Sequence, residues 1–311
     1  MRRQMVVLVP RAKTSPGTTN SLPFSGVRRS IQFGDKSNQL FHQSIHFSHD
    51  RGTSPHAAID DGSPFLASDT MFETRYGRPT TLTSKRLAAP TVAETSELLA
   101  TSTSQFGIEQ YSFLFAPYAP AGAYEEMVHF LPYALDFLRL RPTEGFQIVD
   151  GVIWFISEYR LRLATDDLLE AVQQAIRVTF SDWTQDFKVV HLDGTQMSER
   201  GSSHAYGNYV WNSDAAIRLL EALAEYNVHL DLCEEMILSL VEHPSDWRQS
   251  AWLLEIVRQI REHQCTIDSD RVNALAHDTS LLSHHYRIVK SHDNGIDESY
   301  WHDLSVAIGL H

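Results

Sequence analysis

The chain has 311 residues, of which 42% are hydrophobic and 21% charged, and this ordinary globular composition excludes a wholly disordered, collagen-like or coiled-coil protein. No stretch reaches the roughly 18 apolar residues of a membrane-spanning helix, and two cysteines, Cys233 and Cys265, are too few for a disulfide framework. The formal net charge of −13 repels phosphate backbones at long range. We therefore expect a soluble, cytoplasmic protein whose partners include neither a membrane nor a nucleic acid.

The charge is unevenly spread and marks off the segment 1–70. This segment holds eight Lys and Arg against five Asp, a net charge of +3, so residues 71–311 carry −16. Ser, Thr, Gly, Pro, Asn and His dominate it without helical or strand periodicity, which predicts a flexible N-terminal extension. The change in composition also fits a protein whose translation begins at Met71. His42, His46 and His49 have the spacing of a metal site, although adventitious metal binding is the simpler interpretation.

Residues 71–122 form a transitional segment with little regular pattern. The sequence predicts a short helix over 94–100, and alternating aromatic residues over 111–115 predict a short strand. A second short strand is predicted over 188–192. Pairing of the two strands would give one small β element.

From residue 123 to residue 311 the pattern is helical. Apolar residues recur at steps of three and four. The first helical run begins at 123 and is kinked or split by Pro132, and further helices are expected over 146–163, 166–187, 214–227, 231–242, 246–263 and parts of 268–290 and 297–309.

Polar residues at the helix starts predict N-caps. Thr165, Asp166 and Asp167 offer side-chain oxygens before the helix over 166–187, and Ser213 and Ser245 do so for two later helices. Connections of two or three residues force neighbouring helices antiparallel. The fold class is therefore predicted to be all-α, or predominantly α, with antiparallel helical hairpins in a bundle or a short helical-repeat-like stack.

The strong catalytic motifs are absent from the sequence. It contains no P-loop, no glycine-rich dinucleotide turn, no HExxH, no CxxC pair and no GxSxG elbow. Cys233 falls on an apolar helical stripe, where a small buried hydrophobe is the usual interpretation. Trp183 and Trp252 also lie on apolar stripes and are assigned to the core.

Sixteen histidines include an excess of His-Asp dipeptides. The run Asn-Ala-Leu-Ala-His-Asp over 273–278 resembles the centre of the HD-type metal phosphohydrolases, an all-helical family, although the Thr-Ser-Leu that follows departs from the family pattern. The resemblance implies a divalent metal ion held by His243, His277 and Asp278, which would activate water for phosphoester hydrolysis. The simpler interpretation is that His277 ends a helix near the surface.

A long loop over 193–212 carries an aromatic cluster without secondary-structure pattern. Its candidate binding residues are His204, Tyr206, Tyr209 and Trp211. Exposed aromatic side chains on a loop are good recognition anchors. The simpler interpretation is that they pin the loop to the body.

Two functional hypotheses remain. The leading one is a non-catalytic protein–protein interaction module without a cofactor, whose helical surface, with loop 193–212, binds another protein. The alternative is a metal-dependent phosphohydrolase with HD-like geometry. Convergence of His243, His277 and Asp278 would support the hydrolase, and an exposed apolar patch or a groove along the helices would support the interaction module.

Overall fold

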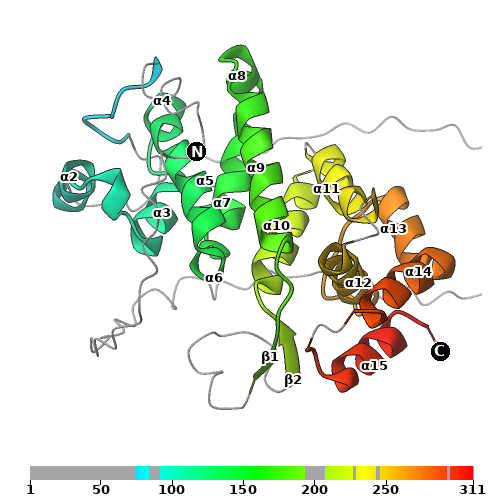
Figure 1. Ribbon diagram of the computed structural model, residues 1–311. Coiled ribbons are helices and arrows are strands. Elements are labelled where there is room, and N and C mark those ends of the chain that lie inside the picture. Colours follow the sequence, from blue (N-terminus) through cyan, green and yellow to red (C-terminus); the bar gives the residue numbers. More distant parts are fainter. Residues whose placement is uncertain are drawn as a thin grey trace, which may run out of the picture. The chain divides into compact units, whose positions relative to one another are not determined.

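The computed structural model describes residues 75–83, 92–192, 207–226, 229–242, 246–292 and 295–310, and the fold is given for these residues. They form antiparallel-packed helices and one small two-stranded sheet, which confirms the predicted fold class (Figure 1). The predicted extension 1–70, with its histidine cluster and the start at Met71, lies outside the described residues.

The N-terminal part of the described chain contains five α-helices joined by turns and irregular segments. Its helices are α2 (Val92–Ala100), α3 (Ile108–Leu114), α4 (Tyr124–Met127), α5 (Leu131–Leu140) and α6 (Pro142–Gly145).

The strand predicted over 111–115 is wrong, because most of this segment is α3. Tyr111, Leu114 and Phe115 are buried together. Their spacing of three and four residues puts them on one face of a helix. The sequence shows this helical spacing as clearly as the alternation that predicted a strand. The helix expected over 94–100 is confirmed as α2.

The expected interruption at Pro132 is also confirmed. A 3-10 turn, Val128–Phe130, separates α4 from α5, and Pro132 lies in the first turn of α5. There its missing N–H removes no hydrogen bond that the helix needs.

Two long helices, α9 (Leu169–Thr184) and α10 (Ser213–Glu225), occupy the centre of the described fold. Figure 1 shows α2–α5 on one side of them and the C-terminal helices on the other. The helix expected over 146–163 is two helices, α7 (Val149–Glu158) and α8 (Arg160–Thr165). Helix α7 packs on α10 and α5 packs on α9, so apolar faces of the N-terminal helices cover one side of the centre.

Two of the predicted N-caps are wrong. Leu168 precedes α9, while Asp167 has a backbone φ of 61° and Asp166 bonds elsewhere. Helix α10 begins at Ser213 itself, after Asn212 with a φ of 65°. Ser245 lies outside the described residues, and the cap of the following helix is Asp246, whose carboxylate accepts the Arg248 N–H at 2.9 Å.

The C-terminal part confirms the expected helices. They are α11 (Leu230–Glu242), α12 (Trp247–Arg261), α13 (Asp270–His277), α14 (Thr279–Lys290) and α15 (Glu298–Ala307). Helix α12 packs against α11, α14 and α15. The side chain of Trp252 on α12 is 0% exposed and that of Trp183 on α9 is 4% exposed, which confirms that both belong to the core.

The sheet consists of β1 (Val189–Leu192) and β2 (Gly207–Val210). The strand predicted over 188–192 is confirmed, but it pairs antiparallel with β2 and not with 111–115. Its register places Val189 opposite Val210. Because β2 leads within three residues into α10, the sheet positions the start of that helix.

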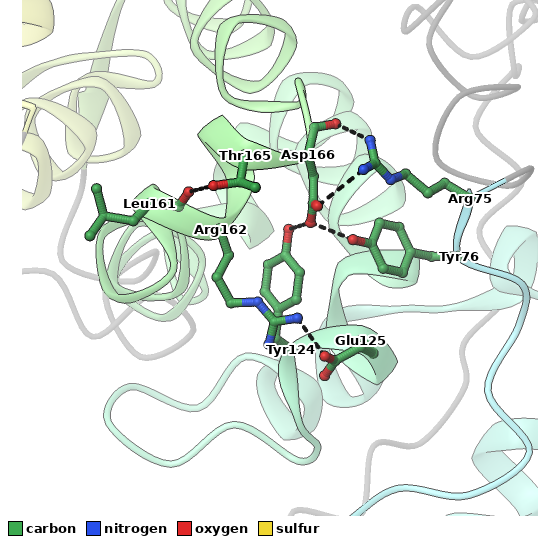
Figure 2. A network of polar contacts seen from close by, with 8 residues as sticks. All are labelled: Arg75, Tyr76, Tyr124, Glu125, Leu161, Arg162, Thr165 and Asp166. Carbon is green, nitrogen blue, oxygen red and sulfur yellow. Dashed lines mark hydrogen bonds and ion pairs between the residues drawn. The ribbon is translucent and has the colours of Figure 1, made fainter.

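A polar network attaches the beginning of the described chain to the helical body (Figure 2). The carboxylate of Asp166, just after α8, accepts hydrogen bonds from the hydroxyls of Tyr76 and Tyr124, the latter at 2.8 Å. Arg75 donates to the Asp166 carbonyl oxygen at 2.6 Å and lies 3.3 Å from its carboxylate. Beside it, Arg162 lies over the Tyr124 ring at 4.2 Å and pairs with Glu125 at 2.5 Å.

Candidate functional site

Helix α10 is buried on every side except one charged stripe. Ala, Leu and Ile side chains fill its buried faces. The residues that reach solvent are Asp214, Arg218, Glu221 and Glu225. Steps of four, three and four residues align them along one face of the helix. The solvent-accessible side chains of this central helix are therefore all charged.

A groove of about 350 Å³ runs along this stripe. Its floor is Asp214, Arg218 and Glu221 on α10, and its walls include Phe146 before α7 and Gln259 on α12. A smaller cavity of about 90 Å³ adjoins it and shares Phe146 and Asp214. Its other lining residues include Gln147, Tyr209 and Asn212. We call the groove, this cavity and the charged stripe the α10 groove.

One arginine is shared by three carboxylates in the α10 groove. Arg218 lies 2.5 Å from Asp150 on α7, 3.3 Å from Glu221 and 3.9 Å from Glu225. Burial alone would lower the pKa of Arg218, but Asp150 and Glu221 outweigh it and raise that pKa. Asp214 lies one helical turn before Arg218 on the same stripe, and the stripe together with Asp150 has a net charge of −3.

An aromatic cluster lies at the C-terminal end of the stripe. It consists of Tyr118 from the loop before α4, Trp154 on α7 and Tyr226 after α10. The Tyr118 ring meets Trp154 at 5.8 Å and Tyr226 at 6.5 Å between centroids, both edge to face. Burial, the Tyr118 hydroxyl and the charges of Glu225 and Asp150 raise the pKa of Tyr226. These rings therefore lie within the field of the charged stripe.

Of the four residues predicted on loop 193–212, two lie in the described part of the chain, where the predicted loop is wrong for 207–210 because these residues form strand β2. Tyr209 on β2 is 8% exposed and lines the smaller cavity, and burial together with Asp214 raises its pKa to about 12. Trp211 is partly buried, and its backbone N–H donates to the Lys188 carbonyl at 2.8 Å. His204 and Tyr206 lie outside the described residues. A binding role for this loop stays a prediction.

The structure places two of the three predicted metal ligands. His277 ends α13 with its Nδ1 atom 2.8 Å from the Asn273 carbonyl, and Asp278 caps α14 by accepting the Leu281 N–H at 3.0 Å. Both side chains are exposed, while His243 lies outside the described residues. Within the described ranges, no three His, Cys, Asp or Glu side chains are grouped so as to hold a metal ion. Convergence with His243 stays a prediction.

Sequence reasoning missed the charged stripe and the aromatic cluster. The sequence signals that could have found them are modest: charged residues at helical spacing between 214 and 225, and Tyr118 set between Pro117 and Pro120. What makes these residues a site is the packing of α7 and α11 against α10, with Gln259 of α12 in the wall of the groove.

Three further findings bear on function. Across the described helices, none combines the length and apolar character needed to cross a bilayer. Cys233 and Cys265 are free and buried, and burial raises the pKa of the Cys233 thiol to about 12, which agrees with its interpretation as a small core residue.

In comparisons with protein-family models, with curated proteins and with solved structures, the chain has no significant match.

Proposed function

We propose that this protein is a non-catalytic binding module that takes a positively charged segment of a partner protein along the α10 groove. The observation that carries the proposal is the stripe of α10. A helix buried on its other faces keeps a row of charged side chains along a groove, and together with Asp150 this row has a net charge of −3. Charge complementarity of this kind attracts and orients a partner.

The size of the groove sets the length of the segment. Helix α10 has 13 residues and is therefore about 20 Å long. Extended chain rises about 3.3 Å per residue, so roughly six residues of a partner would cover the stripe. Phe146 and Ile217 add apolar surface between the charges. The negative potential works against nucleic acid as the occupant, because phosphates would meet the same carboxylates.

The test uses a peptide of stated composition. A fluorescein-labelled nine-residue peptide of three Gly-Ser-Arg units is titrated with the full chain and followed by fluorescence anisotropy at low salt. The variant Glu221→Gln/Glu225→Gln removes two groove charges with little change of shape. We expect it to weaken binding about fivefold, since each exposed ion pair contributes about 0.2–1 kcal/mol.

The matched control is Glu109→Gln/Glu242→Gln, which changes the net charge equally at exposed carboxylates on α3 and α11. We expect its affinity to stay within twofold of the unmodified protein. Equal weakening in both variants would mean that the peptide follows net charge and not the groove, and would contradict the proposal. Absence of binding at low salt would do the same.

A further inference from the structure

Tyr118 is held outward in an unusual backbone conformation. Its side chain is 66% exposed, and its φ of 60° lies in the left-handed region that a bulky residue rarely adopts. Pro117 and Pro120 flank it and restrict the chain on either side. Such a conformation costs about 1–3 kcal/mol and persists where the surroundings impose it.

The surroundings of Tyr118 fix its ring as well as its backbone. The Ala119 N–H donates to the Ala116 carbonyl at 3.1 Å and closes the turn. The ring lies edge to face against Trp154, and its hydroxyl is 3.3 Å from that of Tyr226. A rigid exposed aromatic loses little conformational entropy when a ligand covers it, which is what a recognition anchor requires.

The electrostatics of the cluster favour a cation. The faces of Tyr and Trp rings are negative and attract guanidinium and ammonium groups. Asp150 and Glu225 lie close enough to raise the pKa of Tyr226, and Arg218 is already shared among carboxylates. Between described residues, the cation–π pairs that form involve other rings.

The same fold contains an internal example of the geometry. Arg162 lies over the Tyr124 ring at 4.2 Å while its guanidinium pairs with Glu125 (Figure 2). A planar guanidinium can do both at once, because its face stacks on the ring while its edge donates hydrogen bonds. A lysine ammonium has no such face.

We infer that Tyr118 is the platform for an arginine side chain of the partner segment, with the guanidinium stacked on its ring and paired with Glu225. The inference rests on the proposed function and adds the residue type that the groove selects. The ring contacts of Tyr118 also favour arginine over a methylated ammonium group as the ligand. Caged ammonium needs open space between rings, whereas Tyr118 touches both neighbours edge to face and its hydroxyl meets that of Tyr226.

The experiment compares four Gly-Ser-Arg peptides that differ only in the residue at the middle arginine position: arginine, lysine, trimethyllysine or the uncharged citrulline. Anisotropy competition with the full chain gives their relative affinities. We expect arginine to bind about threefold to fivefold more tightly than lysine, with citrulline weakest. Trimethyllysine as the tightest ligand, or equal affinity for arginine and lysine, would overturn the inference.

Two variants separate this inference from the proposed function. Tyr118→Ala should abolish the preference for arginine over lysine and leave the affinity for the lysine peptide within twofold, while Tyr118→Phe should retain the preference. Upfield NMR shifts of the arginine δ protons on binding would report ring stacking and should vanish in Tyr118→Ala. Equal loss for both peptides in Tyr118→Ala would overturn the inference. Failure of all four peptides to bind would instead contradict the groove itself.

Discussion

Asp166 joins parts of the chain that lie far apart in sequence. Its bonding partners Arg75, Tyr76 and Tyr124 are 91, 90 and 42 residues away. Asp166 lies before a helix, where aspartate commonly caps, and the sequence pattern therefore predicts a local role. Partners at such distances leave no local signal, so this use of the side chain could be found only in the folded chain.

Replacing the Asp166 carboxylate should weaken the fold. Burial alone would raise the pKa of Asp166, but the hydrogen bonds from Tyr76 and Tyr124 and the charge of Arg75 outweigh it and lower the pKa. Its stabilising effect is therefore present above the unfolded-state pKa near 3.9 and is lost as the pH falls through the lower folded-state pKa. We expect Asp166→Asn to reduce the free energy of unfolding by about 1–2 kcal/mol at pH 7, measured by urea denaturation.

Asp268→Asn is the matched control for that measurement, since Asp268 is exposed. Its effect should stay below about 0.5 kcal/mol. The interpretation of Asp166 as a structural attachment point fails if the two variants are equally stable.

At the scale of elements, the close packing of helix α7 against the end of α3 depends on a single glycine. A Cβ atom at Gly151 would lie 1.4 Å from the Phe115 carbonyl oxygen and 2.6 Å from its carbon. The neighbour is backbone at the end of α3, so it cannot rotate away as a side chain would. The close approach of these two segments therefore requires glycine at this position.

Gly151→Ala should destabilise the protein by about 2–5 kcal/mol, because the clash forces α7 away from α3. Thermal unfolding and urea denaturation of the purified protein measure the loss. Gly77→Ala is the control, since nothing lies within 4 Å of a Cβ there, and its stability should be nearly unchanged. A Gly151→Ala protein as stable as the control would show that α7 can shift freely.

The sequence predicts helices best in segments whose apolar residues fit the helical spacing and not the strand spacing. Helices α9 to α15 follow steps of three and four, and their expected ranges agree with the structure to within a few residues. Segment 111–115 was ambiguous because Phe113, Leu114 and Phe115 are all apolar and satisfy both the strand and the helix period. The partner of β1 could not be chosen from sequence, since short strands carry no mark of their neighbour.

The candidate site was less predictable than the helices. Tyr209 was identified by its place in an aromatic loop, and it lines the smaller cavity. Charged residues at 214, 218, 221 and 225 look like an ordinary solvent-facing stripe until the helices beside α10 turn it into a groove. Trp154 lies in a stretch that is apolar on most faces, which hides its position at the surface edge of α7.

At the scale of the whole molecule, two buried histidines link stability to pH. His229 and His285 are each 1% exposed, and burial lowers the pKa of each to about 4, with smaller effects from Arg160 and His284 respectively. The His285 Nδ1 atom lies 2.9 Å from the Ser250 hydroxyl oxygen. Both imidazoles are therefore neutral in the folded state at pH 7.

Stability should fall as the pH drops from about 6.5 towards 4, because the unfolded chain binds protons that the folded chain excludes. At pH 5 the loss should be about 2 kcal/mol for each histidine relative to pH 7. Urea denaturation at the two pH values measures it, and His285→Asn should lose about half as much from this source. A pH dependence unaltered in His285→Asn would contradict the assignment of a buried neutral imidazole.

The two buried thiols make it possible to measure how often this part of the protein opens locally. Cys233 and Cys265 are 0% and 3% exposed, and burial raises the pKa of both thiols. A thiol reagent can therefore modify them only when the region around α11 and the end of α12 opens. The rate of modification under native conditions reports how often that happens, and a cysteine introduced at the surface can be labelled selectively while both native thiols stay in place.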